Sequence, residues 1–399
     1  MSGPTVQKAQ RLLTVPEPST VRWIGDEVDP RRTGLKASAL ESIWKDVEAL
    51  YATGLHPAVG LTLRHRGHVV LDRACGHVDV AQTRVVDGDT LWNVFSASKL
   101  VSAVLVMALV ERDELRLDVP LSTYLPTLTA SDATLRQLLM HRAGLHRMPP
   151  LGVSMEACLD EDFQLEALAQ VRPFAPGWTA YSPMLFGVLL GQLVLRTQGC
   201  DMQQLASELL PDLGIRFGTD RPQDVAEHAL TAPSPRPMLR VFRDTVGWPL
   251  DEAIEFSNSL AFKTAVLPSA NVMGTGRDLT RFLQLLLNGG EIDGVRVLKE
   301  RTVRHMVHER TPRSPDGTFG FPMRYGLGPM LGGDRMSLFG LGTRGAFGHL
   351  GLTTVVLYAD PRRELCVALL NTGKPLLAPG FVRWYKALQR IPMVVPRSS

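Results

Sequence analysis

The chain has 399 residues, 45% of them hydrophobic and 21% charged, and a formal net charge of +3. These proportions are typical of a globular protein, and the interleaved charges exclude the basic surface of a nucleic-acid-binding protein. The apolar runs are shorter than the roughly 20 residues that cross a membrane, and the N-terminus lacks a signal-peptide run, so we expect a cytoplasmic protein with no membrane span.

The first half of the chain begins with a surface segment and continues as a helix, a hairpin and a second helix. Residues 1–30 are polar and contain prolines, which predicts an arm; a transit peptide is the alternative, because the first acidic residue is Glu17. Apolar spacing predicts a helix over 36–51 and strands over 59–65 and 68–72. The almost wholly apolar run 100–110 predicts a helix buried on all sides.

The middle of the chain has mostly helical periodicity, and the last hundred residues change to strand periodicity. Further helices are predicted over 134–145, 162–171, 183–197, 202–210, 277–288, 300–308 and 380–390. Strands are predicted over 325–330, 337–339, 353–359 and 365–370. Segment 240–262 has no clean period and predicts a long loop with short helices that walls a substrate pocket.

This order of elements predicts an α+β fold in which the two ends of the chain build one antiparallel sheet flanked by helices. We expect an arm over 1–30, a discontinuous sheet domain over 31–92 and 290–399, and a mainly helical domain over 93–289. A ligand site is expected where the sheet and the helical domain meet.

Cysteine and histidine usage gives no sign of a metal site or a cofactor. The ten histidines are scattered, and no C-x-x-C pair occurs, so neither a zinc site nor a disulfide framework is predicted. Free buried thiols are expected at Cys75, Cys158, Cys200 and Cys366.

Ser96 and Lys99 stand at the start of the apolar helix, and their spacing places them on one helical face. A lysine that burial holds neutral can take the proton of a serine nucleophile, and a helix N-terminus favours a developing oxyanion. The alternative is a serine that only caps a core helix. Ser42 and Lys45 have the same spacing but lie in an amphipathic stretch, which predicts an ordinary surface helix.

Two later segments can complete such a site. Tyr181 precedes an apolar helix, and a phenol beside cationic Lys99 is expected to ionise more easily and to pass on a proton; the alternative is a tyrosine packed at a helix start. Glycines crowd 345–353, where His349 and Gly351 are expected to contact substrate and the Leu352 N–H to donate to an oxyanion. The alternative there is a glycine-rich turn with an exposed histidine. Substrate contacts are also predicted for Phe242 and Trp248.

The three segments together resemble a known set of motifs. Ser96-Ala97-Ser98-Lys99, Tyr181-Ser182-Pro183 and His349-Leu350-Gly351 are similar, in this order, to the motifs of the serine β-lactamase/DD-peptidase superfamily, in particular its class C branch and the family VIII carboxylesterases. The resemblance runs from about residue 35 to 390 and includes 138–145, 268–282 and 325–328.

This resemblance implies a β-lactamase/transpeptidase-like fold with the active site between the sheet and an all-helical domain. It implies that Ser96 is the acylated nucleophile, that Lys99 and Tyr181 share the role of base, and that the N–H groups of Ser96 and Leu352 form the oxyanion hole. We therefore expect a serine hydrolase that cleaves small carboxylic esters through an acyl-enzyme. The oligomeric state is left open.

The departures from the family pattern favour a neutral ester. The third motif is usually Lys-Thr-Gly, but His349 and Leu350 occupy its first two positions, and Pro183 replaces the Asn of the second motif. Lys263-Thr264-Ala265 lacks the glycine and is interpreted as a chance match. The alternatives are an acyltransferase, a weak β-lactamase or peptidase, and a binding protein without catalysis; an α/β-hydrolase is excluded because no Gly-x-Ser-x-Gly occurs.

Overall fold

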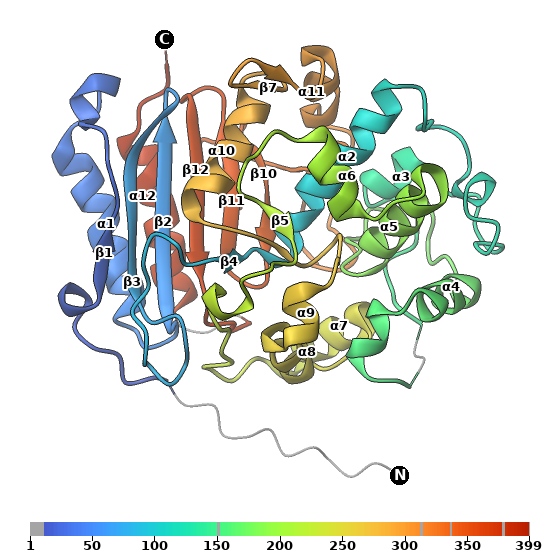
Figure 1. Cartoon of the computed structure of the whole chain (residues 1–399), viewed down its shortest axis with the longest axis horizontal. Helices are drawn as coiled ribbons and strands as arrows, with labels where there is room; N and C mark the ends of the chain where they lie inside the picture. The colour runs from blue at the N-terminus through green and yellow to red at the C-terminus, as the bar shows by residue number, and fades with distance from the viewer. Residues whose placement is uncertain (1–11, 150–151, 312–313, 336, 377–379, 399) are drawn as a thin grey trace.

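The computed structural model describes residues 12–149, 152–311, 314–335, 337–376 and 380–398. A seven-stranded antiparallel sheet occupies one half of the molecule, and helices fill the other half (Figure 1). The strand order is β1 (Arg22–Ile24), β3 (His68–Gly76), β2 (Ala58–His65), β12 (Leu365–Asn371), β11 (Val355–Asp360), β10 (Phe347–Gly351) and β9 (Met330–Leu331).

The centre of the sheet joins the two ends of the chain. β2 pairs with β12 along its length, from His65 opposite Leu365 to Val59 opposite Asn371. This pairing confirms the prediction that both ends build one sheet. The hairpin between β2 and β3 turns through Arg66, whose φ is 50°, and the following glycine, whose φ is 80°. Two positive φ values match the right-handed twist that a two-residue hairpin requires.

Helices cover both faces of the sheet. α1 (Ala37–Tyr51) and α12 (Phe381–Val394) pack on each other and on one face, whereas α10 (Gly276–Leu287) packs on β2, β11 and β12 from the other side. A Cβ atom on Gly276 would lie 2.0 Å from the Thr62 hydroxyl oxygen, so only glycine permits this close approach. α10 thus lies on the sheet although its residues fall within the segment 93–289 predicted as helical domain.

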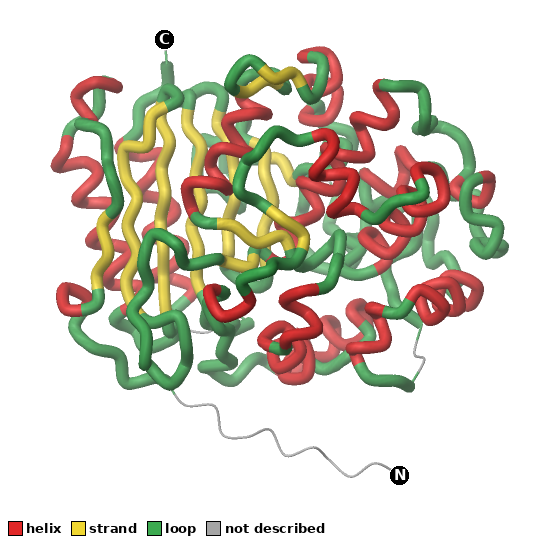
Figure 2. The backbone as a smooth tube through the Cα atoms, in the orientation of Figure 1, coloured by secondary structure: helices red, strands yellow, loops and turns green. Residues whose placement is uncertain are grey.

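Helices, red in Figure 2, fill the other half of the molecule around α2 (Ser98–Glu111). α2 contacts α5 (Leu185–Gln198), α6 (Met202–Leu209) and β10. Every residue of α2 from Ser98 to Leu109 is buried, which confirms the prediction from its apolar sequence. The surrounding helices are α3 (Leu135–Leu139), α4 (Glu161–Gln170), α5 (Leu185–Gln198), α6 (Met202–Leu209), α7 (Arg236–Val246), α8 (Leu250–Asn258), α9 (Leu260–Thr264) and α11 (Glu300–Val307).

Segment 240–262 is more helical than the sequence predicted, because three short helices, α7 to α9, follow one another there. Prolines stand in the first turn or cap of α7 and α8, and Gly247 ends α7 with a φ of 101°. Each helix is therefore too short and too sharply bounded for its period to extend across the segment.

Other differences concern very short strands. Part of the predicted arm forms the edge strand β1, and its first eleven residues lie outside the described residues. Residues 337–339 form no strand, and 325–330 keeps only β9. Two small sheets were not predicted, because strands of two or three residues show no alternation: β4 (Trp92–Asn93), β6 (Val272–Gly274) and β5 (Arg216–Phe217), and β7 (Glu291–Ile292) with β8 (Val295–Arg296).

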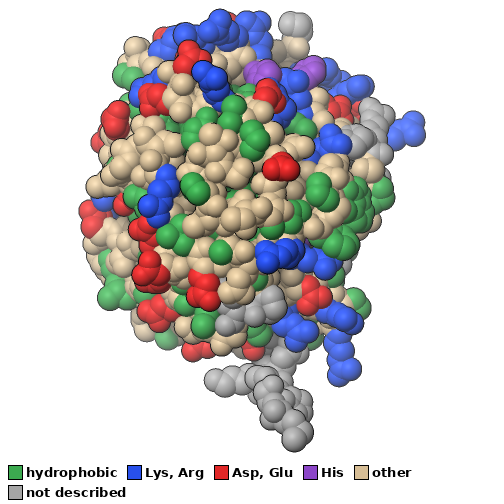
Figure 3. Space-filling model, turned by 90° about the vertical axis from the view of Figure 1, so that its right-hand side faces the viewer, with side chains coloured by type: hydrophobic (Ala, Val, Ile, Leu, Met, Phe, Trp, Pro, Cys, Tyr) green, Lys and Arg blue, Asp and Glu red, His purple; other side chains and the backbone are tan. Residues whose placement is uncertain are grey.

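The surface agrees with the composition, whereas the expectation of a buried thiol is wrong for Cys200. At the helical end of the molecule, acidic, basic and apolar side chains are interspersed, with basic ones gathered along the upper edge (Figure 3). All four cysteines are free; Cys200 is partly exposed and the others are buried. Within the described ranges, no helix has the length and apolar character needed to cross a membrane.

Candidate active site

Ser96 lies in a single 3-10 turn, η3 (Phe95–Ala97), between β4 and α2. Phe95 has a φ of 46°, in the left-handed region that side-chain-bearing residues seldom adopt. Its ring packs 4.6 Å from the His228 ring and 6.4 Å from the Phe262 ring, which holds this backbone in place. Ser96 itself is partly exposed, so its hydroxyl can reach a substrate.

Lys99 is fully buried directly behind Ser96. Its Nζ lies 3.2 Å from Ser96 Oγ and donates to the Ser269 carbonyl at 3.2 Å. Burial lowers the pKa of Lys99 well below 10.5, because a charged amine is poorly stabilised away from water. A neutral amine at hydrogen-bond distance from a hydroxyl can accept its proton, and the role of Lys99 as the base stays a prediction.

The segment 268–272 fixes the start of α2. The Ser98 hydroxyl accepts from the Val272 N–H at 2.8 Å, and the Ser102 hydroxyl donates to the Pro268 carbonyl at 2.6 Å. By contrast, the Ser42 hydroxyl donates to the Ala39 carbonyl within α1, and Lys45 is exposed. The second Ser-x-x-Lys pair is thus part of an ordinary surface helix, as predicted.

Tyr181 lies beside Lys99, with its ring centroid 5.2 Å from Lys99 Nζ. Its hydroxyl is buried and makes no well-aligned hydrogen bond within the described part of the chain. Burial raises the pKa of Tyr181, the Ser96 hydroxyl opposes this by hydrogen bonding, and the charge of Asp316 raises the pKa further. The hydroxyl thus lies close to Ser96 and remains protonated at neutral pH.

The prediction that cationic Lys99 makes Tyr181 ionise more easily is therefore wrong. Lys99 has a lowered pKa and Tyr181 a raised one, and burial is the larger cause in both cases. Burial thus favours the uncharged form of both the amine and the phenol. Such a pair can still relay a proton, with the amine accepting and the phenol donating.

His349 is also fully buried, so the alternative of an exposed histidine is wrong. Its ring lies 5.9 Å from the Tyr181 ring, and its Nδ1 lies 2.6 Å from the Leu350 carbonyl oxygen. A carbonyl can only accept, so Nδ1 carries the proton and Nε2 is left as an acceptor. Burial, with the nearby Lys99, lowers the pKa of His349 to about 3, and the ring is neutral at pH 7.

Gly351 brings the end of β10 against the nucleophile turn. A Cβ atom at this position would lie 2.2 Å from the Val94 carbonyl oxygen. Only glycine allows this contact, which places partly exposed Leu352 in the turn that follows. The oxyanion-hole role of the Ser96 and Leu352 N–H groups stays a prediction.

The two predicted pocket residues of segment 240–262 lie within the helical half. Trp248 is buried, its Nε1 donates to the Val153 carbonyl at 2.8 Å, and its ring lies 6.5 Å from Phe163. Phe242 packs on the same core. These contacts explain how both side chains are held, and their role toward substrate stays a prediction.

Two further residues, which the sequence did not link to the site, hold Tyr181 in place. The His141 ring lies 4.8 Å from the Tyr181 ring, and its Nδ1 accepts from the Ser182 N–H at 3.1 Å. The carboxylate of Asp316 accepts from the Tyr181 N–H at 3.0 Å. Asp316 follows a proline and precedes a glycine, which indicates only a turn, so no local signal connected it with Tyr181.

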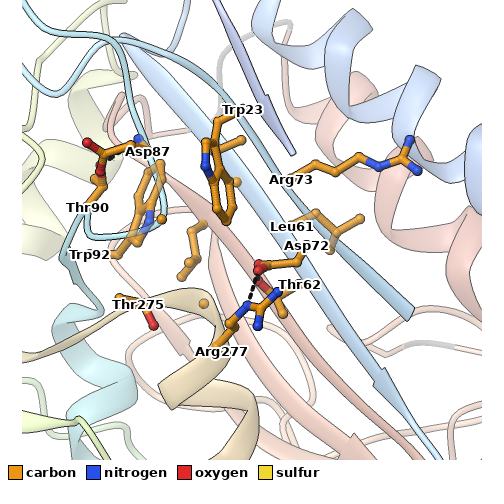
Figure 4. A pocket seen from close by; sticks show the side chains of 15 residues that line it. Trp23, Leu61, Thr62, Asp72, Arg73, Asp87, Thr90, Trp92, Thr275 and Arg277 are labelled. Atoms are coloured by element: carbon orange, nitrogen blue, oxygen red, sulfur yellow. Dashed lines mark hydrogen bonds and ion pairs between the residues drawn. The ribbon is translucent and has the colours of Figure 1, made fainter. Parts of the chain in front are cut away.

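Two cavities lie outside this cluster. The one in Figure 4 has a volume of about 20 Å³, room for about one water molecule, and two of its lining residues are joined, because Arg277 donates to Asp72. A second, of about 190 Å³, is lined by Arg216, Asp220 and Met273 among others, and Arg216 is paired with Asp220. Neither is lined by Ser96 or Lys99, so the reacting groups point elsewhere.

Comparison with known proteins agrees with this arrangement. The sequence matches the family described as Beta-lactamase over residues 45–390. It is 28% identical over 360 residues to the esterase/beta-lactamase LipL of Mycobacterium tuberculosis, covering 81% of this chain and 80% of LipL. It is 28% identical over 371 residues to the esterase EstB of Burkholderia gladioli, covering 83% and 93%.

Solved structures share the fold. A family VIII carboxylesterase is 25% identical, with a TM-score of 0.75 over 89% of this chain and 98% of that one. A penicillin-binding protein homologue from Caulobacter crescentus is 23% identical, with a TM-score of 0.78 over 90% of this chain and 99% of that one. At that identity the second similarity supports the fold alone.

Proposed function

We propose that this chain, which belongs to the beta-lactamase family and is an esterase/β-lactamase-like serine hydrolase, hydrolyses neutral carboxylic esters. The proposed route is an acyl-enzyme on Ser96. The observation that carries the proposal is the 3.2 Å separation between the partly exposed Ser96 hydroxyl and the fully buried Lys99 amine. Burial lowers the pKa of Lys99 and so favours its unprotonated form, and the Ser96 hydroxyl in contact with it supplies the proton.

The proposed reaction has two steps. Ser96 Oγ attacks the ester carbonyl while its proton passes to Lys99, and Tyr181 donates a proton to the departing alcohol oxygen. The proton on Lys99 then restores Tyr181, so that the products of this step are an acyl-enzyme and a neutral alcohol. In the second step water attacks the acyl group, gives up its proton through the same pair, and releases the acid.

A neutral ester suits the third motif better than a carboxylate-bearing substrate. The pKa of His349 is lowered to about 3 by burial and by Lys99, so the position that a lysine usually occupies carries no charge at pH 7. Leu350 has no hydroxyl and Pro183 no side-chain amide. The esterase names of LipL and EstB point in the same direction.

The test is the intact-protein mass after brief exposure to a fluorophosphonate, with turnover of p-nitrophenyl acetate, p-nitrophenyl butyrate and a chromogenic cephalosporin measured in parallel. We compare the wild type with Ser96→Ala and use Ser42→Ala as the matched control, because Ser42 has the same spacing to a lysine. One adduct and fast ester turnover are expected in the wild type and in Ser42→Ala, and neither in Ser96→Ala.

Two results would contradict the proposal. An adduct that survives in Ser96→Ala would assign the nucleophile to another residue. Cephalosporin turnover that is faster than ester turnover would make the protein a β-lactamase in spite of its uncharged third motif.

A further inference from the structure

Three aromatic side chains close to Tyr181 are open to solvent. Trp178 is 44% exposed, Phe319 is 38% exposed and Phe321 is 39% exposed. Single exposed apolar residues are common, but apolar groups that gather at one place usually mark a binding site. We call these three residues the aromatic surface.

The aromatic surface continues outward from the ring of Tyr181. The Phe319 ring stacks on the Tyr181 ring, with centroids 5.0 Å apart and an interplanar angle of 27°. Phe321 lies 5.6 Å from Phe319. Trp178 comes from another segment but lies beside Gly317, which is in the same loop as Phe319 and Phe321. A Cβ atom on Gly317 would come within 3.2 Å of the Trp178 indole ring. The rings therefore lead from a buried phenol to solvent.

Asp316 fastens this loop to Tyr181. The buried carboxylate accepts from the Tyr181 N–H at 3.0 and 3.2 Å, from the Thr318 N–H at 2.8 Å and from the Phe319 N–H at 3.0 Å. It also accepts from the Tyr325 hydroxyl at 3.1 Å. One side chain thus holds both the loop and the tyrosine, so the aromatic surface has a fixed position relative to the Tyr181 hydroxyl.

We propose that the aromatic surface binds the alcohol part of an ester whose alcohol is apolar, in particular one that carries an aromatic ring. This inference rests on the proposed function, because it uses Tyr181 as the group that protonates the departing oxygen. The leaving oxygen must come within hydrogen-bond distance of the Tyr181 hydroxyl. The group attached to that oxygen then extends along the rings that continue from Tyr181.

The order of bond changes gives the inference a kinetic signature. The bond from Ser96 Oγ to the acyl carbon forms and the bond from that carbon to the alcohol oxygen breaks in the first step, and the alcohol leaves with one proton. The alcohol is absent when water attacks the acyl-enzyme. The aromatic surface therefore contributes to acylation and to kcat/KM. Esters that carry the same acyl group on different alcohols form the same acyl-enzyme and share its deacylation rate.

The experiment compares benzyl acetate with ethyl acetate, which give the same acetyl-enzyme. We expect kcat/KM of the wild type to be about tenfold higher for benzyl acetate. Phe319→Ala and Phe321→Ala are expected to reduce this ratio about tenfold, and Phe319→Leu to retain part of it. Phe381→Ala is the matched control, because Phe381 is 37% exposed on α12, and its ratio should equal that of the wild type.

The outcomes separate this inference from the proposed function. Ser96-dependent ester turnover without a benzyl preference would overturn the inference and leave the proposed function standing. Alanine variants whose ratio is unchanged, or that instead alter the preference between acetyl and hexanoyl esters of one alcohol, would also overturn it. Absence of ester turnover that depends on Ser96 would overturn both.

Discussion

Lys99 and Lys374 are both fully buried, and both lie against the nucleophile turn, but their surroundings differ. Lys99 Nζ lies 3.2 Å from the Ser96 hydroxyl. Lys374 Nζ donates to the Asn371 carbonyl at 2.7 Å and lies 5.0 Å from the centroid of the Phe95 ring. Burial lowers the pKa of each amine well below 10.5.

A lowered pKa is common to Lys99 and Lys374, but only Lys99 contacts a hydroxyl that can react. Desolvation favours the neutral form of both amines. Only the amine that faces a hydroxyl with access to solvent can take a proton from a nucleophile, whereas Lys374 faces a carbonyl and a ring. A lowered lysine pKa therefore identifies a catalytic base only together with the group that the lysine contacts.

The largest expected effect tests Lys99. Lys99→Met should reduce the rate of fluorophosphonate labelling and the kcat of p-nitrophenyl acetate hydrolysis by about 10³-fold, because the base is lost. The folded protein no longer has to bury a neutral amine that is protonated in the unfolded chain, so the melting temperature should be unchanged or higher. Retained turnover in a folded variant would remove Lys99 from the mechanism.

The second effect concerns acid stability and the residues around Lys374. Burial, with Lys374, lowers the pKa of His56 to about 3, below the value of about 6.5 expected in the unfolded chain. Its contribution to stability is complete above pH 6.5 and is lost as the pH falls toward 3. From pH 7.5 to 5 this loss amounts to about 2 kcal/mol of unfolding free energy.

Urea denaturation at both pH values measures this loss. His56→Gln should reduce the difference between the two unfolding free energies by about 2 kcal/mol. His68→Gln is the control, because the His68 side chain is exposed and stays hydrated in the folded protein. If the change in unfolding free energy between pH 7.5 and pH 5 were the same in His56→Gln, in His68→Gln and in the wild type, His56 would not be a source of acid sensitivity.

A smaller effect is expected for His349, which lies beside Tyr181 but is neutral. His349→Ala should lower kcat/KM for p-nitrophenyl acetate about tenfold and change the preference among esters, since it reshapes the site without removing the base. Kinetics over a series of acyl chains measures both. A loss as deep as that of Ser96→Ala would mean that His349 takes part in the proton transfers.

The smallest effect on activity is expected for Lys374. Lys374→Met should keep kcat within about threefold of the wild type, because the amine does not contact a reacting group, and should raise the melting temperature for the reason given for Lys99. Thermal melting and ester kinetics on the matched pair, Lys99→Met and Lys374→Met, test the comparison directly. Equal losses of activity in both variants would show that the rigidity of the nucleophile turn matters as much as the base.

Much of the fold could be predicted from the sequence, because long elements with a clear period dominate it. The helices at 37–51 and 98–111, the hairpin at 58–76 and the C-terminal strands lie close to their predicted positions. Segment 236–264 was less predictable, because Gly247 and Pro249 separate α7 from α8, and Ser259 ends α8 and caps α9. The contact of α10 with the sheet depends on the space above Thr62, which no local pattern contains.

The site was predictable where one segment brings its groups together. Ser96 and Lys99 lie one turn apart, and their contact follows from helical spacing. The protonation states were harder to predict. Tyr181 was expected to ionise beside a cation, whereas burial lowers the pKa of the amine and raises the pKa of the phenol, which favours the uncharged form of both. Asp316 was missed because it acts 135 positions away from Tyr181 along the chain.

The pairing of β2 with β12 has a consequence for synthesis on the ribosome. The strand at residues 58–65 emerges well before its central partner at 365–371, because the whole helical half of the molecule is encoded between them. Until then β2 and β3 form an incomplete sheet with an open edge, a species prone to association. The turn that follows Gly351 also arrives late, so a nascent or truncated chain carries Ser96 and Lys99 without the strand that faces them.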